Sequence, residues 1–575
     1  MRFFRHLDTG MRNVLSACAV GAFLLHVPGA FAQISEGGLP PSFKYAQTLR
    51  SALKKTEAPV DFYAEDLREV DNWRAREGAP MPVAKLIEVD YTPENSGSRT
   101  ALPGGERIWQ LHLSVPGATA VMLYYRDFYI PDGGKLFIYS ADKARVLGAY
   151  TRNTHPDGGL FATEFIGGDE LILEYVEPET GSPEKPRIHI SEIGYGYNTA
   201  ALKTFFGITT RSGSCMVNIN CEEGEAWQNE KNGVCHTVQK IGKMSYICSG
   251  ALMNNTAEDF APLILTARHC AYQEDKLKGK MEVAADASDM KQWLFYFHLE
   301  REDCSNGSFA APAKTMTGCK LLVNTGMEGG SDGMLLQLNA MIPEEYNVFY
   351  NGWDRRDTPA SSGANLHHPG GDYMKISTYG TPAKQYTFRS SDFTGRTNAH
   401  WDVTFQQTAN GHSVTEGGSS GSPLYNENKL VVGTLTGGNS TCIFPTGLNI
   451  YGKMSYHWDK FNADSAHMDV WLDPAGSGVQ TLAGRFRRVF KPVPLNVRAV
   501  NLGRSISLSW DAPSGAERPA SYNVYRNNQR IGNATSTTFT DGGPTVGSLV
   551  YSISAVYEDG EESPFASTTV SFVEF

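Results

Sequence analysis

The sequence predicts a mainly β protein built from several units, and three observations support this. A chain of 575 residues is too long for one hydrophobic core, so about three units are expected. Short runs of alternating apolar and polar residues, separated by glycine and proline, recur near both ends of the chain. All cysteines except Cys18 lie between Cys215 and Cys442, which indicates a separate central unit that bears disulfides.

Residues 1–32 are typical of a signal peptide. Basic residues precede an apolar run from Val14 to Val27, and Ala30-Phe31-Ala32 places small residues where a signal peptidase cuts. Cleavage after Ala32 is expected, so the mature protein is predicted to be secreted or periplasmic. Cys18 stands at the start of the apolar run instead of its end, which argues against lipid attachment. No stretch reaches the ~20 apolar residues of a membrane-spanning helix, so no transmembrane segment is predicted.

Residues 33–211 are predicted to form an N-terminal β-sandwich, preceded by a helical segment over 42–55. The turn signals PDGG and IGGD separate its short β-rich runs, a pattern typical of sandwiches. The expected strands are Ile108–Val115, Ala120–Ile130, Lys135–Ser140 and Glu170–Pro178.

Residues 490–575 form another predicted strand ladder at the C-terminal end. Trp510, Tyr525 and Tyr551 are spaced like the core aromatic residues of a fibronectin type III module, which this segment resembles. Such a module serves as a spacer or adhesion unit, so no catalytic role is expected there.

The stretch GSSGSP, from Gly418 to Pro423, raises the question of chemistry. A serine nucleophile needs a tight turn with small neighbours and backbone N–H groups directed at the developing oxyanion. Ser420 is therefore the predicted nucleophile, with the N–H groups of Gly418 and Ser420 as the oxyanion hole. A glycine- and serine-rich loop without any role is an equal alternative as long as this stretch is considered alone.

Two further stretches favour catalysis. The apolar strand LILTARHC ends in His269, a predicted general base whose loop the neighbouring Cys270 would pin through a disulfide. In GGSDGMLLQL, Asp332 enters an apolar strand and is predicted to orient that histidine. The order His269, Asp332, Ser420 is that of chymotrypsin-type enzymes and differs from those of subtilisins and α/β-hydrolases.

Together, the motifs TARHC, SDGMLLQL, HHPGGDYMKIS, VTEGGSSGSPLYN, VVGTLTGG, YGKMSYHW and VWLDPAGSGVQTLAG resemble the secreted lysyl endopeptidase branch of the trypsin-like serine proteases. The resemblance implies two six-stranded antiparallel β-barrels within residues 212–484, with the triad between them and a C-terminal helix near Val470. It also implies a protein or peptide substrate and a precursor, or zymogen, form.

The same resemblance implies the disulfides Cys215–Cys442, Cys221–Cys304 and Cys248–Cys270. Cys235 and Cys319 remain, and we pair them by elimination.

The expected substrate pocket consists of Val414, Thr436, Asn449 and Trp401. Relatives that cut after lysine carry an Asp where this chain has Asn449, and a histidine where it has Thr436. An amide cannot neutralise a buried ammonium group, so the sequence leaves lysine and an uncharged residue open at P1. Asp354 and Asp372 are other acids that could reach the pocket. Glutamate at P1 is less favoured, because Leu435 stands where glutamate-specific relatives have a histidine.

Residues 33–211 have two possible roles. They are expected to be a propeptide that occludes the cleft until cleavage near Arg211, since relatives are made as precursors; the alternative is a binding domain that stays attached. The formal charge of −11 argues against nucleic-acid binding, and a monomer is expected. Neither CxxC nor HExxH spacing occurs in the sequence, so no metal or organic cofactor is predicted. A catalytically silent, protease-like binding protein is the rival functional class.

Overall fold

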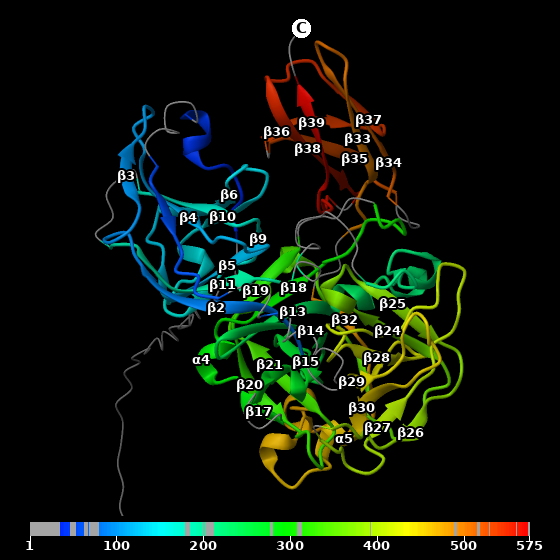
Figure 1. The fold of residues 1–575 in the computed structure, drawn as a ribbon. Coiled ribbons are helices and arrows are strands. Elements are labelled where there is room, and N and C mark those ends of the chain that lie inside the picture. Colours follow the sequence, from blue (N-terminus) through cyan, green and yellow to red (C-terminus); the bar gives the residue numbers. More distant parts are fainter. Residues whose placement is uncertain are drawn as a thin grey trace, which may run out of the picture.

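Strands are the main regular structure of the chain in the computed structural model (Figure 1). The residues that it describes are 35–45, 53–62, 67, 80–178, 184–198, 202, 212–275, 280–307, 313–391, 393–487, 491–513, 518–527, 529–558 and 560–572. The predicted signal peptide and Arg211 lie outside them. None of the described helices is long and apolar enough to cross a membrane.

The N-terminal unit is the predicted β-sandwich, since two sheets enclose one apolar core that includes Trp109, Leu123 and Leu173. The predicted helical segment is confirmed at its start, where Pro41–Tyr45 is a short 3-10 helix (η1), and it is wrong at its end, where Lys55 begins a strand. One sheet contains β1 (Lys55–Glu57), β3 (Ser98–Ala101), β4 (Arg107–Ser114), β6 (Lys135–Ser140), β7 (Val146–Tyr150) and β10 (Glu170–Val176). The other contains β2 (Met81–Tyr91), β5 (Ala120–Tyr129), β8 (Phe161–Ala162), β9 (Ile166–Gly167) and β11 (Arg187–Gly196).

The first half of the central unit is a barrel. Its strands follow the order β13, β14, β15, β21, β20, and β18 pairs with both β13 and β19. Only Gly318 separates β19 from β20, so these two act as one bent strand and the path closes on itself. The bounds are β13 (Val234–Ile241), β14 (Met244–Met253), β15 (Leu263–Ala267), β18 (Leu294–Phe297), β19 (Lys314–Thr317), β20 (Cys319–Asn324) and β21 (Gly333–Leu338).

The second half of the central unit is built on a ten-stranded sheet in the described part of the chain. Apolar side chains of both halves, such as Leu265 and Tyr425, share one core between them. The helix predicted near Val470 is present as the short α6 (Asp469–Leu472), which follows α5 (Met454–Asp459). The strands are β12 (Val217–Asn218), β23 (Trp353–Asp354), β24 (Gly363–His367), β25 (Lys375–Tyr379), β26 (Lys384–Tyr386), β27 (His400–Asp402), β28 (Pro423–Asn426), β29 (Val431–Gly438), β30 (Asn449–Lys453) and β31 (Thr481–Leu482).

The N-terminal and central units share a sheet, which the sequence did not predict. Strand β2 pairs antiparallel with β14, from Lys85 opposite Met244 to Met81 opposite Ile247 (Figure 1). Apolar side chains of both units form one further core along this junction, including Val83, Met122 and Leu294.

The C-terminal unit is a second sandwich of three and four strands. Trp510 and Tyr551 are buried in its core as predicted, but Tyr525 is only half-buried and donates to Glu562 instead. Its neighbour Tyr522 takes the core place, with its ring 5.3 Å from that of Trp510. The strands are β33 (Leu495–Asn501), β34 (Ile506–Asp511), β35 (Ser521–Arg526), β36 (Gln529–Ala534), β37 (Thr538–Asp541), β38 (Gly547–Val556) and β39 (Ala566–Phe572).

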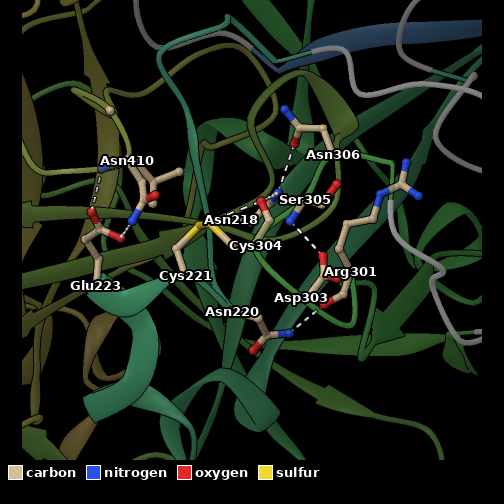
Figure 2. The surroundings of a disulfide bond; sticks show 12 residues. Asn218, Asn220, Cys221, Glu223, Arg301, Asp303, Cys304, Ser305, Asn306 and Asn410 are labelled. Atoms are coloured by element: carbon tan, nitrogen blue, oxygen red, sulfur yellow. Dashed lines mark hydrogen bonds between the residues drawn. A yellow bond between two sulfur atoms is a disulfide. The ribbon is translucent and has the colours of Figure 1, made fainter. Parts of the chain in front are cut away.

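Three disulfides form as predicted, namely Cys215–Cys442, Cys221–Cys304 and Cys248–Cys270. Figure 2 shows the second of these, where Nδ2 of Asn218 donates to the Cys304 carbonyl at 2.9 Å and to Asn306. This contact holds β12 against the loop that carries Cys304.

The predicted pair Cys235–Cys319 is wrong, because both are free thiols. Cys235 lies on β13 and Cys319 on β20, with β14, β15 and β21 between them along the sheet. Sγ of Cys319 faces the Met290 carbonyl at 3.6 Å, and burial raises the pKa of both thiols.

Candidate active site

His269 and Asp332 leave neighbouring strands at the same end of the first barrel. Strand β15 pairs with β21 so that Ala267 stands opposite Gly333, which brings the residues just beyond them together. The imidazole Nδ1 of His269 lies 2.7 Å from Oδ2 of Asp332, and the His269 backbone N–H donates to Oδ1 at 2.8 Å. Both side chains are fully buried. The carboxylate therefore fixes the ring orientation and favours a proton on Nδ1.

Asp332 holds this position with a left-handed backbone, at φ 61°. Its N–H donates to the Gly326 carbonyl and its own carbonyl accepts the N–H of Arg268, both at 2.8 Å. Aspartate and asparagine are the non-glycine residues that tolerate this conformation best. The strained turn is thus over-determined by hydrogen bonds on both sides, as expected where geometry matters.

Ser331 connects this turn to a buried histidine of α5. The Ser331 hydroxyl lies 2.8 Å from Nδ1 of His457, whose Nε2 lies 3.1 Å from the hydroxyl of Thr434. Burial lowers the pKa of His457 to about 3, so its ring is neutral at ordinary pH. Sequence reasoning missed this contact, because nothing in the motif YGKMSYHW distinguishes His457 from a core residue.

Ser420 belongs to a tight turn that packs against β14 and β15. Its carbonyl accepts the N–H of Ser249 at 2.8 Å, and the Ser249 hydroxyl donates to the Gly418 carbonyl at 2.9 Å. Gly418 and Gly421 both have positive φ, 93° and 77°. A side chain at Gly421 would lie 2.1 Å from the hydroxyl oxygen of Thr266, so only glycine allows this approach.

These contacts place the serine turn beside the histidine. Ser249 follows Cys248, which is bonded to Cys270, the residue after His269. Nε2 of His269 has no hydrogen-bond partner in the described part of the chain. Ser420 keeps 8% of its surface exposed. A buried imidazole nitrogen without a partner is suited to accept and return a proton.

The predicted oxyanion hole also has open donors. Within the described residues, the N–H groups of Gly418 and Ser420 donate to no protein acceptor. The turn is supported from behind by His367, whose Nδ1 lies 2.7 Å from the hydroxyl of Ser419. Burial lowers the pKa of His367 well below its usual range, so it supplies no positive charge.

Asn449 is the predicted pocket residue with the most contacts to the expected pocket stretches. Thr415, which follows Val414, donates its hydroxyl to Oδ1 of Asn449 at 2.9 Å, and β29, which carries Thr436, pairs with β30 through Gly438 and Asn449. The hydroxyl of Ser440 donates to the same Oδ1 at 2.6 Å. Sequence reasoning missed Ser440, which lies in a loop whose alignment with relatives is gap-prone.

Trp401 is buried, like the other three predicted pocket residues. Its ring packs with Tyr451 and Leu435 in an apolar core of the second half of the central unit. The ammonium of Lys453 lies 3.8 Å from the ring centroid. Because Trp401 pairs with Tyr451 across β27 and β30, its side chain stays on the barrel side of the sheet.

The two alternative acids are engaged elsewhere. Asp354 binds Arg356 and accepts from Asn426 at 3.1 Å. Asp372 accepts the N–H and hydroxyl of Ser212 and lies 3.6 Å from Nζ of Lys375. In the described part of the chain, the side chain of Asn449 bonds to Thr415, Ser440 and two backbone carbonyls, and not to these two acids.

In the described part of the chain, one group of side chains of the kinds that bind metals lies close together, namely Cys248, His269 and Cys270. It does not fit a metal, since its two sulfur atoms are joined in a disulfide and its imidazole is bound to Asp332.

Comparison with known proteins identifies the central unit. Residues 209–452 match the family model "Lysyl endopeptidase, C-terminal domain". Lysyl endopeptidase of Pseudomonas aeruginosa is 28% identical over 475 residues, covering 76% of this chain and 94% of that protein. The chain is similar to lysyl endopeptidase, and this similarity supports a serine endopeptidase.

Solved structures of serine proteases are among the matches to this endopeptidase. Protease Anisep from Arthrobacter nicotinovorans shares 15% sequence identity with this chain, and a Glu endopeptidase shares 18%. Each covers 39% of this chain, and 91% and 86% of its own, with TM-scores of 0.27 and 0.24.

Proposed function

We propose that this serine endopeptidase, exported by its signal peptide, hydrolyses peptide bonds through an acyl-enzyme on Ser420. The contact between His269 and Asp332 beside the serine turn carries the proposal. Nε2 of His269 would take the Ser420 proton as the hydroxyl attacks the carbonyl, and would then return it to the leaving amine. Asp332 stabilises the imidazolium without itself becoming protonated. The N–H groups of Gly418 and Ser420 would receive the oxyanion.

The Ser420→Ala variant tests this assignment. We expect loss of turnover with an unchanged unfolding temperature. The substitution removes only the hydroxyl of a residue that is 8% exposed, and backbone hydrogen bonds hold the turn in place. A fluorophosphonate should label the wild type at Ser420 and leave the variant unlabelled. Ser361→Ala, an exposed serine of the second barrel, is the matched control. Full activity of Ser420→Ala would overturn the assignment, and absence of labelling in the wild type would favour a silent binding protein.

We also propose that the enzyme prefers an uncharged residue at P1. The side chain of Asn449 is fully used: Oδ1 accepts from Thr415 and Ser440, and Nδ2 donates to the carbonyls of Val403 and Gly447, both at 3.2 Å. None of these partners is a carboxylate. A buried ammonium without a counter-ion costs several kcal/mol, which disfavours lysine.

Cleavage of a mixed peptide library, read by mass spectrometry, tests the P1 preference. Wild-type enzyme should cut after uncharged residues, and Asn449→Asp should gain cleavage after lysine. Cuts by the wild type confined to lysine would overturn the proposal. In that case, Asp402→Asn would test whether Asp402 is the acid that binds the lysine side chain. Asp402 lies on the neighbouring strand and accepts the backbone N–H of Asn449 at 3.3 Å.

We also propose that the chain has four segments: a signal peptide (1–32), an N-terminal unit (33–211), the protease (212–484) and a fibronectin type III-like unit (490–575). The closed first barrel and the core shared by both halves of the central unit support the bounds of the protease segment.

A further inference from the structure

The side chain of Asn449 has one orientation that satisfies its neighbours. Two backbone carbonyls, those of Val403 and Gly447, each lie 3.2 Å from one end of its amide. A carbonyl only accepts, so this end is Nδ2, and Oδ1 faces the hydroxyls of Thr415 and Ser440 at 2.9 and 2.6 Å. Because Oδ1 cannot donate, both hydroxyl protons point to it. The two hydroxyl oxygens are left with lone pairs alone.

These two oxygens are acceptors that no protein group uses. In the part of the chain that the structure describes, nothing donates to the hydroxyl oxygen of Thr415 or of Ser440. The two residues keep 8% and 6% of their surface exposed, whereas Asn449 is fully buried. A side chain that enters the predicted pocket therefore meets two oxygens that can only accept, with the amide of Asn449 behind them.

Thr415 connects this pair of oxygens to the serine turn. The N–H of its neighbour Glu416 donates to the hydroxyl of Ser419 at 3.2 Å, and the N–H of Ser419 donates to the Glu416 carbonyl at 3.0 Å. Ser419 immediately precedes the predicted nucleophile Ser420. The acceptor pair is thus tied to the turn at which the scissile bond is expected.

Ser440 is held in place by its own loop. Its N–H donates to the Leu448 carbonyl at 3.4 Å, and a methyl group added to Gly447 would lie 2.8 Å from the Cα of Ser440. Only glycine at position 447 allows this approach. Cys442, two residues further along the chain, is bonded to Cys215. The position of the Ser440 hydroxyl is therefore fixed before a substrate arrives, so little ordering is needed on binding.

We propose that the P1 residue of the substrate carries a carboxamide, as glutamine and asparagine do. This inference rests on the proposed function of Ser420 and names the substrate class of the same site. The nitrogen of a carboxamide has two hydrogens and no charge. It matches two acceptor oxygens whose printed hydrogen-bond partner, among the described residues, is an amide and not a carboxylate.

Other side chains of similar size match these acceptors less well. A carboxylate would place lone pairs against lone pairs. An ammonium group would be buried without a counter-ion. Methionine and leucine resemble glutamine and asparagine in size but donate nothing, so the hydroxyl oxygens would lose water and gain no partner.

Fluorogenic peptide amides that differ only at P1 test the proposal on the purified enzyme. We expect kcat/KM for glutamine to exceed that for methionine, or kcat/KM for asparagine to exceed that for leucine, by at least about tenfold, because two hydrogen bonds distinguish the members of each pair. Substrates with glutamate or lysine at P1 should be cleaved more slowly than the preferred amide.

Variants of Thr415 separate its hydroxyl from its shape. Thr415→Val replaces the hydroxyl by a methyl group of the same size and should reduce the preferred ratio by about fivefold or more. Thr415→Ser keeps the hydroxyl and should keep the ratio. Thr358→Val, at an exposed threonine of the same half of the central unit, is the matched control. The ratio is the readout, so a general loss of activity in a variant cancels.

Labelling of Ser420 by a fluorophosphonate distinguishes failure of this inference from failure of the proposed function. With labelling intact, equal cleavage within both pairs, faster cleavage after lysine or glutamate, or a ratio that Thr415→Val leaves unchanged would overturn the carboxamide preference. Labelling without cleavage of any of these substrates would overturn it too. Absence of both labelling and cleavage would overturn the proposed function and, with it, this inference.

Discussion

Asp332 combines a strained backbone with a fully buried carboxylate. Its φ of 61° restricts the position to few residue types, and both carboxylate oxygens are used by His269. Asparagine tolerates the same backbone conformation and is nearly the same size, so replacing Asp332 by asparagine removes the negative charge and keeps the shape. The position therefore allows a clean test of the electrostatic role.

Asp332→Asn is expected to fold normally and to lower kcat by about four orders of magnitude, because an amide favours the wrong imidazole tautomer and cannot stabilise the imidazolium. Steady-state ester hydrolysis and the unfolding temperature measure the two effects. Asp132→Asn, an exposed acid of the N-terminal unit, should change neither. A loss of less than about tenfold would contradict the role of Asp332.

Residue by residue, the sequence predicted the chemistry better than the pocket. His269 and Asp332 were recognisable because each ends or begins an apolar strand, and the structure brings them into contact. Their roles, and that of Ser420, stay predictions. The place of Trp401 in the pocket also stays a prediction, because motif likeness gives the strand but not which face of the sheet receives the side chain. Cys235 and Cys319 were paired only because they were left over.

At the scale of elements, the disulfide Cys248–Cys270 joins β14 to the turn that carries His269. It closes a loop with a sequence separation of 22 residues. Removing it with Cys248→Ala and Cys270→Ala should cost about 3 kcal/mol of stability and lower kcat as well, because His269 loses its anchor. Thermal unfolding and ester turnover measure the two effects.

The disulfide Cys221–Cys304 provides the matched control. It lies at the loop of residues 301–306, where Asn218 and Asn220 donate to the backbone carbonyls of Cys304 and Arg301 (Figure 2). Its removal should lower the unfolding temperature without lowering kcat. Equal losses of kcat for the two pairs would show that the Cys248–Cys270 bridge does not position His269.

The four predicted strands of the N-terminal unit agree with β4, β5, β6 and β10 to within one or two residues, because alternation of apolar and polar side chains is a local signal. The pairing of β2 with β14 could not be predicted. It joins residues far apart in the chain, and β2 is buried at Met81–Ala84 with no alternation there. A continuous buried run does not reveal which strand will lie beside it.

At the scale of the whole molecule, buried neutral histidines make stability depend on pH. Burial lowers the pKa of His368 to about 4, and of His400 and His457 to about 3. The unfolded chain binds more protons than the folded chain between these values and about 6.5. Stability is therefore expected to fall as pH drops from about 6.5 towards 4, by up to about 1.4 kcal/mol per pH unit for each group.

His400→Phe identifies one contribution. Both ring nitrogens of His400 lack partners in the described part of the chain, and the ring lies 5.8 Å from that of Phe388. An apolar ring should therefore reduce the slope of the unfolding temperature against pH between pH 6.5 and 4.5. An unchanged slope would contradict burial of a neutral imidazole at this position.

The junction between the N-terminal and central units predicts what a cut near Arg211 would do. After a cut near Arg211, the N-terminal fragment should co-elute with the protease in size-exclusion chromatography, because β2 and the shared core remain in place. Met81→Asp should weaken the association. Immediate separation of the wild-type fragments at micromolar concentration would contradict a large interface of this kind.

The edge of β14 that β2 covers also bears on solubility. Without its N-terminal unit, the protease would present unpaired N–H and C=O groups at residues 244–247, beside the apolar side chains of Tyr246 and Ile247. An open edge of this kind is a template for pairing with other chains. The mature enzyme would then be prone to self-association at high concentration, and a bound peptide that covers this edge would act as its stabiliser in storage.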